Sequence, residues 1–361
     1  VYEGSNVKTL WNSNAMGLLS GVSEFFGLDI GTTAVRLVEL RGAGKVKALT
    51  KYAFIPIDSK VSMSDSKADQ QKLAQAVQEL LAQAKITAKN VAVGLPSSRV
   101  FTTVVDIDRL SEDEVAKTIQ YQADSIIPTP LAESKLDWAV LGDSPKDKTK
   151  SEVLITSVTN AYVEERLDML ESIGLNVIAF EPDSMALSRA VIPADTTTPQ
   201  MVLDIGHKST DLVISMSGAP RLVRSIPTGA EAIIKSASQN LNIDDKQAQQ
   251  FVFKFGLSKD KLEGQIYNAI LGTVDILMME IEKSIKFFQA RYTQSRVDRV
   301  VVTGGASALP EFPLYIANKF NINVEIGNAW RNVSFPPDRQ NELLAASNHF
   351  CVAAGLAERE E

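Results

Sequence analysis

Short apolar runs separated by segments with a helical repeat give the chain its pattern. The runs predict strands at 34–40, 52–57, 91–95, 100–107, 137–141, 152–159, 177–180, 221–226, 299–303 and 322–326. Apolar residues spaced three and four apart predict helices at 67–84, 111–127, 161–173, 244–255 and 275–292. Strands that alternate with helices over this length indicate an α/β protein with two substantial cores.

One strand–turn–strand pattern occurs twice, in Leu28 to Thr33 with the strand 34–40 and in Leu203 to Thr210 with the strand 211–216. A glycine turn brings backbone N–H groups close to an anion, and hydroxyl side chains add hydrogen bonds. An aspartate beside a phosphate is repelled unless a cation lies between them, so Asp29 and Asp204 each imply Mg²⁺ reached through water. Without a ligand, the same segments are two β-hairpins with glycine turns.

A third segment, Val300 to Ser307, is a buried strand that runs into a double glycine, where backbone can lie against a flat ligand. The three motifs in this order resemble the phosphate-1, phosphate-2 and adenosine motifs of the actin-like ATPase superfamily, and the resemblance covers residues 27–358. It implies an α/β, actin-like fold of two lobes, in which a ribonuclease-H-like unit is duplicated, one copy in each lobe. It also implies ATP with Mg²⁺ between the lobes and a slow ATPase at most.

The resemblance also assigns site residues. The two metal-site carboxylates are Asp29 and Asp204, and the cofactor residues are Gly31, Thr32, Thr33, Gly206, His207, Lys208, Ser209, Thr210, Gly229, Glu280, Lys283, Gly304, Gly305 and Ala306. For Glu280 and Lys283 the alternative is a solvent-facing pair of opposite charge three residues apart on a helix.

Two acidic residues, Glu181 and Asp183, begin a helix after the strand 177–180. Glu181 matches a glutamate that helps to position the attacking water in DnaK-type chaperones, and it is the candidate catalytic residue. Asp183 matches an acidic position in relatives of the family. The alternative for both is an acidic helix start stabilised by the helix dipole, which we favour for Asp183.

Residues 99–174 form a β-α-β-β-α block that resembles subdomain 1C, which the PilM and FtsA families carry in place of subdomain 1B of actin. The segments 101–107, 127–128 and 136–137 resemble PilM more than FtsA. The PilM resemblance implies a cytoplasmic scaffold of type IV pilus assembly, peripheral at the inner face of the membrane. Its implied partner is the N-terminal tail of a PilN-like single-pass membrane protein. An FtsA-like filament protein and a sugar kinase of the same superfamily are the alternatives, ranked lower.

The family organisation gives expected boundaries: 16–98 and 175–197 for subdomain 1A, 99–174 for 1C, 198–230 and 293–345 for 2A, 231–292 for 2B, and 346–361 for a C-terminal helix that returns to 1A. Ser13-Asn14-Ala15 before Met16 is expected to be a cloning scar. Residues 1–12 are then an expression leader or a partner-like peptide with Val7, Leu10 and Trp11 as anchors.

The composition argues against several other classes of function. The net charge is −7 and basic residues do not cluster, which argues against nucleic acid as the main partner. The single cysteine excludes an intrachain disulfide, and two histidines make a histidine-based metal site or a Ser-His-Asp triad improbable. No apolar run is long enough to span a bilayer.

Overall fold

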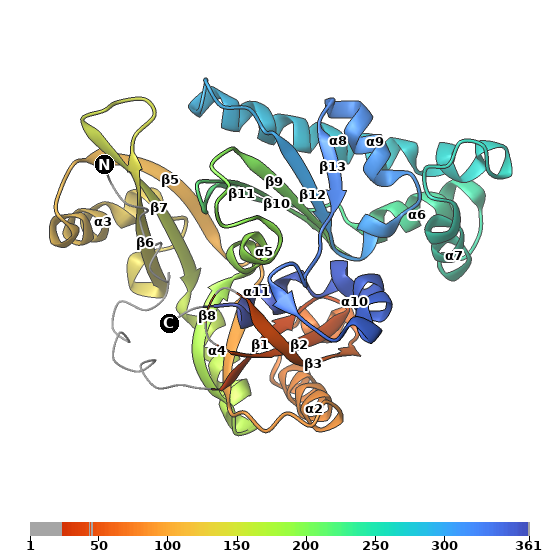
Figure 1. Ribbon diagram of the computed structural model, residues 1–361, viewed down its shortest axis with the longest axis horizontal. Coiled ribbons are helices and arrows are strands. Elements are labelled where there is room, and N and C mark those ends of the chain that lie inside the picture. The colour runs from red at the N-terminus through yellow and green to blue at the C-terminus, as the bar shows by residue number, and fades with distance from the viewer. Residues whose placement is uncertain (1–23, 43, 45, 360–361) are drawn as a thin grey trace.

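The computed structural model describes residues 24–42, 44 and 46–359. The predictions for the first fifteen residues, and most of an apolar segment at 17–26, therefore lie outside the described residues. Figure 1 shows two lobes, each built on one sheet, and a third small sheet beside them.

The first lobe has a six-stranded sheet in the order β14-β3-β2-β1-β4-β8. Its strands are β1 (Phe25–Ile30), β2 (Ala34–Arg41), β3 (Lys47–Pro56), β4 (Asn90–Leu95), β8 (Asn176–Pro182) and β14 (Val333–Ser334). The short helix α1 (Ser59–Ser62) precedes α2 (Lys67–Gln83), which begins where the Ser66 hydroxyl accepts a hydrogen bond from the Asp69 N–H. Apolar residues of α2 and α4 (Asn160–Ser172) form one core with alternate residues of β1, β2 and β4.

The second lobe has a five-stranded sheet in the order β11-β10-β9-β12-β13. Its strands are β9 (Gln200–Ile205), β10 (Thr210–Met216), β11 (Ala219–Ile226), β12 (Arg299–Thr303) and β13 (Asn323–Ile326). One face packs against α6 (Ala230–Leu241), α7 (Asp245–Phe255), α8 (Gln265–Arg291) and α9 (Phe312–Phe320).

Both sheets repeat the same order and directions. In each, the first strand pairs antiparallel with the second and parallel with the fourth, the third is antiparallel to the second, and the fifth is parallel to the fourth. This confirms the predicted two-lobed α/β fold made of duplicated units.

Two helices lie between the sheets: α5 (Asp183–Val191) and α11 (Cys351–Ala357). They pack closely because Gly355 lets backbone meet backbone, and a Cβ there would overlap the carbonyl of Ala186. Helix α5 packs against β10 and β11, and α11 against β1, β2 and β4. Before α11 come the short strand β14 and α10 (Gln340–Ala346). Trp330, which precedes β14, and Leu343 of α10 are also buried in this inter-lobe core.

The insertion contains β5 (Phe101–Asp108), α3 (Glu112–Ile126), β6 (Ser134–Asp143) and β7 (Lys150–Thr159), with the strand order β5-β7-β6. Helix α4 differs from its predicted place in this block. Its Tyr162, Val163, Met169 and Leu170 are buried in the first-lobe core, so the structure groups α4 with the first lobe. The return to the first lobe also comes earlier than residue 346, because Val333 and Ser334 pair with β3.

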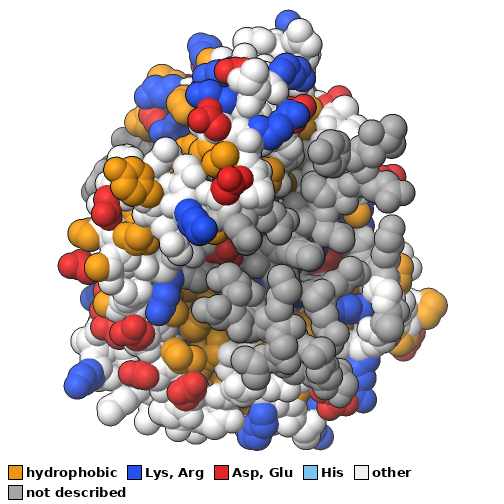
Figure 2. All heavy atoms as spheres, turned by 90° about the vertical axis from the view of Figure 1, so that its left-hand side faces the viewer, with side chains coloured by type: hydrophobic (Ala, Val, Ile, Leu, Met, Phe, Trp, Pro, Cys, Tyr) orange, Lys and Arg blue, Asp and Glu red, His pale blue; other side chains and the backbone are white. Residues whose placement is uncertain are grey.

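Within the described residues, no helix is long and apolar enough to cross a membrane. Figure 2, which views the insertion side, shows acidic, basic and apolar side chains interspersed over the described part of that face. This agrees with the absence of basic clusters in the sequence.

Candidate functional site

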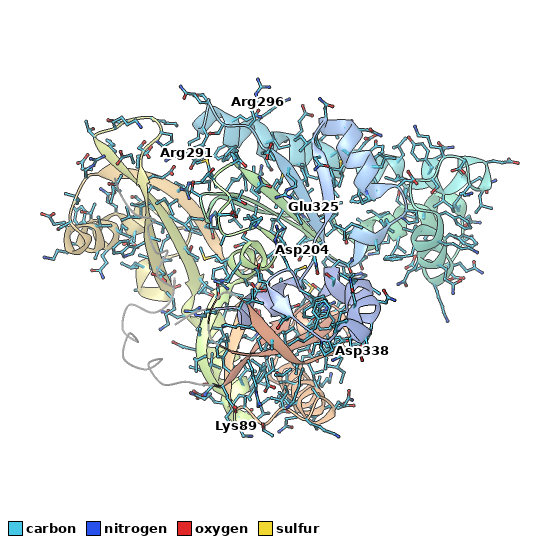
Figure 3. The ribbon with its side chains drawn as sticks, in the orientation of Figure 1. Lys89, Asp204, Arg291, Arg296, Glu325 and Asp338 are labelled. Atoms are coloured by element: carbon cyan, nitrogen blue, oxygen red, sulfur yellow. The ribbon has the colours of Figure 1, made fainter. Side chains whose placement is uncertain are left out.

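A cleft of about 750 Å³ lies between the lobes, and all three sequence motifs open into it. Its first-lobe wall includes Asp29, Gly31, Thr32, Thr33, Arg36 and Ser98. Its second-lobe wall includes Asp204, Gly206, His207, Lys208, Ser209, Asp211, Gly304, Gly305 and Ala306. Figure 3 shows Asp204 between the two sheets. The structure therefore brings together most of the residues that the motifs predicted.

The two hairpins have matching turn geometry. The Gly31 N–H donates to the Ala34 carbonyl at 3.1 Å, and the Gly206 N–H donates to the Ser209 carbonyl at 2.9 Å. An added Cβ would make tight contacts with the same carbonyl oxygens, at 3.0 Å for Gly31 and 3.1 Å for Gly206. The repeat thus extends from strand order down to individual hydrogen bonds, and it places one glycine turn on each side of the cleft.

Two of the predicted cofactor residues, Thr210 and Gly229, pack against the second turn. The Thr210 hydroxyl is buried and donates to the Thr228 carbonyl at 2.7 Å, so it is not directed into the cleft. Gly229 precedes α6, and a Cβ there would lie 2.6 Å from the His207 carbonyl oxygen. Thr210 and Gly229 therefore hold the shape of the turn.

Four carboxylates, Asp29, Asp183, Asp204 and Asp211, line the cleft. Burial raises the pKa of Asp29 to about 6, and the charge of Asp204 adds to this despite the opposing effect of Arg36. Burial also raises the pKa of Asp211 to about 6, and it raises that of Asp204. Burial and the charge of Asp29 raise the pKa of Asp183 well above its ordinary value, and its Oδ1 is buried without a hydrogen-bond partner. The cluster carries more negative charge than its surroundings compensate.

Arg36 lies beside this cluster. It is the cross-strand partner of Asp29, and its Nη1 lies 3.3 Å from Asp29 Oδ2. The corresponding pair in the second hairpin is Asp204 with Asp211. The two halves of the repeat thus place an arginine and an aspartate at equivalent positions, which concentrates positive charge on the first-lobe side.

The third motif forms a bend at the end of β12. Gly304 has a φ of +81°, and a Cβ there would lie 2.6 Å from both Asp204 Oδ1 and the Ile205 carbonyl oxygen. The Gly304 N–H donates to the Asn348 carbonyl at 2.9 Å, and the Asn348 amide donates back to the Gly304 carbonyl at 3.1 Å. Gly305 faces His349, with room for a side chain. The bend is therefore fixed to the segment that leads into α11.

Glu181 does not line the cleft. It is 3% exposed and is ion-paired with Arg189 and with Arg359, whose Nη1 lies 3.4 Å from Glu181 Oε2. A carboxylate held in this way is not placed to orient water in the cleft, so the structure does not support the predicted role. Asp183, two residues later, is the acidic residue of this segment that faces the cleft.

Glu280 and Lys283 also lie away from the cleft lining. They form an ion pair at 2.5 Å on α8, as in the alternative considered for them. The cleft lining instead includes Gln249 and Phe253 of α7, which were not predicted from the sequence. Nothing in the sequence marks these two residues, but Arg36 could have been found from the hairpin register, because it lies directly opposite Asp29.

The residues present fit a nucleotide with a divalent cation. Glycine turns face each other across the cleft, and buried carboxylates with raised pKa values would be stabilised by a cation. Among the described residues, no three acidic, histidine or cysteine side chains are grouped closely enough to bind a metal ion. Coordination through water stays the prediction for a cation at these carboxylates.

Duplicated ribonuclease-H-like lobes with a glycine turn on each side of an acidic cleft define the fold of the actin-like ATPase superfamily. Within it, the family model described as type IV pilus assembly protein PilM matches residues 27–361. The chain belongs to this PilM family. It is also 25% identical over 264 residues to the cell division protein FtsA of Neisseria meningitidis serogroup B, which covers 66% of this chain. The chain spans 62% of the length of that curated relative.

Solved structures agree with the assignment. A PilM–PilN type IV pilus biogenesis complex has a chain with a TM-score of 0.79 and 26% identity, covering 92% of this chain and 97% of that one. The ethanolamine utilization protein EutJ of Carboxydothermus hydrogenoformans has a TM-score of 0.55 at 15% identity, over 92% of this chain and 88% of its own. MreB5 of Spiroplasma citri, bound to ADP, has a TM-score of 0.53 at 13% identity, over 92% and 94%. The last two show the shared fold.

Proposed function

We propose that the protein is an actin-like scaffold of type IV pilus assembly that docks the N-terminal cytoplasmic tail of a PilN-like single-pass membrane protein. The observation that carries this is the similarity, over nearly the full length of both chains, to a chain of a PilM–PilN complex. The tail would lie as an extended peptide between the first lobe and the insertion, along residues 94–105. Such peptides bind by main-chain hydrogen bonds, with alternate side chains in apolar pockets.

The test for the tail is a titration of residues 16–361 with a synthetic peptide of the PilN tail from the same organism. We expect saturable binding by calorimetry, and no binding of a scrambled peptide. A second titration with the separate 1–12 peptide tests whether that segment resembles the tail. Absence of binding by the PilN tail would refute the docking proposal.

The cleft would bind ATP with Mg²⁺, which neutralises phosphate charge when bound. Gly31, Thr32 and Thr33 would face the phosphates from one lobe, and His207, Lys208 and Ser209 from the other. The base would lie against Gly304 and Gly305, and Asp29 and Asp204 would hold the cation through waters. Support comes from the two matching turns and from the acidic cluster whose raised pKa values a cation would relieve.

Asp204→Ala tests the cation site. We expect it to weaken ATP binding in the presence of magnesium more than in its absence, measured by calorimetry under both conditions. Asp211→Asn is a matched control, because it removes a neighbouring carboxylate that was not assigned to the cation. Equal ATP affinity for the Asp204 variant and the wild type under both conditions would contradict the assignment.

Hydrolysis would be well below the median enzyme rate of about 10 per second. Asp183 lines the cleft and has a buried carboxylate oxygen without a hydrogen-bond partner, whereas Glu181 does not line the cleft. If hydrolysis is measurable, Asp183→Asn should reduce it while Glu181→Gln affects mainly stability. The chain would then use ATP chiefly as a ligand that stabilises a closed cleft.

An FtsA-like filament protein is the less favoured alternative. The match to FtsA spans 62% of that protein, whereas the PilM family model matches 27–361. Sedimentation of the protein with ATP, at concentrations that span its cellular level, would reveal filaments.

A further inference from the structure

A network of charged side chains joins the insertion to the second lobe. Arg291, at the end of α8, donates to Asp106 on β5 at 2.6 and 3.2 Å, and to Glu152 on β7 at 2.9 and 3.0 Å. Tyr292 donates its hydroxyl to Glu152 at 2.6 Å, and Arg221 of β11 lies 3.1 Å from the other oxygen of Glu152. Figure 3 shows Arg291 on the side of the second lobe that faces the insertion. We call these five residues the Arg291 network.

The network is largely removed from water. The side chains of Glu152 and Arg221 are 4% and 5% exposed, and those of Arg291 and Asp106 are 15% and 20% exposed. Burial alone would raise the pKa of Asp106, but the hydrogen bonds from Arg291 hold it below its ordinary value. Removing one member of such a network leaves an uncompensated buried charge. The contact therefore has a strong preference for staying formed.

The insertion is connected to one lobe by the chain and to the other by this network. It leaves the first lobe after β4 and returns to it through α4 and β8. Asp106 and Glu152 are cross-strand neighbours on β5 and β7, and they lie on the opposite face of the sheet from Ile107 and Val153, which pack with α3. One whole face of the insertion sheet is thus available to contact the lobes, and its charged part is bonded to the second lobe.

A change in the angle between the lobes must therefore act on the insertion. If the network stays formed, the insertion moves with the second lobe and its contact with the first lobe changes. If the insertion stayed with the first lobe, the buried charges of Arg291 and Glu152 would separate. The first outcome costs less, because among the described residues the ion pair between the insertion and the first lobe, Arg99–Asp65, is solvent-exposed, whereas the Arg291 network is largely buried.

We propose that the Arg291 network makes the insertion follow the second lobe, so that nucleotide binding in the cleft changes the affinity of the groove between the insertion and the first lobe. This rests on the proposed function, since it connects the nucleotide to the partner tail. The coupling is a free energy shared by both ligands, so the tail must change ATP affinity by the same factor as ATP changes tail affinity. The two-state element is the angle between the lobes, which both ligands bias, and the network transmits a change in that angle to the insertion.

The experiment measures tail affinity by calorimetry with and without Mg-ATP, in the wild type and in Asp106→Asn and Arg291→Met. We expect a ratio of about 5-fold or more between the two conditions in the wild type, falling below about 2-fold in Arg291→Met and to an intermediate value in Asp106→Asn. Asp143→Asn is the matched control, because its ion pair with Arg109 is solvent-exposed and lies within the insertion. It should keep the wild-type ratio.

Hydrogen exchange of β5 and β7 supplies a second measurement that needs no tail. We expect Mg-ATP to change amide exchange in these strands in the wild type and in Asp143→Asn, but not in the network variants. Asp106→Asn keeps the size of the side chain, so it remains informative if Arg291→Met does not fold. A wild-type chain that binds neither ligand refutes the proposed function. Binding of both ligands with a ratio near one, or with the same ratio in all folded variants, overturns the network proposal alone.

Discussion

The substitution Gly355→Ala tests the close packing of α5 and α11 in the inter-lobe core. In the wild type, α11 contacts α5 through backbone, and the Gly355 carbonyl accepts a hydrogen bond from Arg189 Nη1 at 2.6 Å. An added methyl would overlap the Ala186 carbonyl and lie 3.0 Å from the Ala186 Cα. All three of the nearest atoms are backbone, so no side chain can rotate away.

An added Cβ would lie 1.8 Å from the Ala186 carbonyl oxygen. The two helices would have to separate by roughly 1.5 Å to restore ordinary contact distances. Overpacking of a close-packed interior costs about 1–3 kcal/mol, and a backbone collision falls at the upper end, near 3 kcal/mol. Better helix propensity of alanine would return at most about 1 kcal/mol of that. We therefore expect Gly355→Ala to lower the free energy of unfolding by about 2–3 kcal/mol.

The assay is urea denaturation followed by circular dichroism, with Gly272→Ala as the matched control. Gly272 lies inside α8, and a Cβ there would meet nothing within 4 Å. The control should therefore gain up to about 1 kcal/mol, because the same substitution carries only the propensity term. Equal midpoints for Gly355→Ala and the wild type would refute the packing described between α5 and α11.

Three further predictions concern the cleft. Gly304→Ala should weaken nucleotide binding by calorimetry at least tenfold, since the positive φ and the contact with Asp204 both oppose a side chain; equal affinity would contradict the bend described. Arg36→Ala should weaken ATP binding more than adenosine binding, because the guanidinium beside Asp29 supplies charge for phosphate; an equal loss for both ligands would exclude a phosphate contact. Burial raises the pKa of Asp211 from 3.8 to about 6, so the native state holds a proton that the unfolded chain releases, and stability falls as pH rises between these values. Asp211→Asn should therefore raise the free energy of unfolding in chelator by about 3 kcal/mol at pH 7.5 and leave it nearly unchanged at pH 3.5, measured by urea denaturation.

Most of the fold and of the candidate site could be predicted from the repeated hairpin in the sequence. Because a strand pairs with its neighbour through a short turn, the pattern at 28–40 and 203–216 determines local register, and with it the position of both glycine turns. The same reasoning extended by one step would have placed Arg36 opposite Asp29 and Asp211 opposite Asp204. These were local relations that the sequence contained.

The remaining differences depend on contacts between distant residues. Glu181 is paired with Arg359, 178 positions later, and no local pattern reveals that partner. Helix α4 has an apolar face that suits either the insertion or the first lobe, and only the assembled core decides between them. Helix α8 begins ten residues earlier than position 275, because Ile266, Ile270 and Val274 continue its buried face across Gly272. Intrinsic propensity at a single glycine is weaker than this burial.

The order of the strands along the chain also determines which lobe can fold first during synthesis on the ribosome. All strands of the second sheet lie within one continuous segment, from Gln200 to Ile326, whereas the first sheet needs β14 and the inter-lobe core needs α11. Domains usually complete folding in the order in which they emerge. Here the second lobe can finish while the first still lacks a strand and its central helix. A nascent chain that has emerged from the ribosome as far as residue 326 would therefore present a protease-resistant second lobe attached to an incomplete first one.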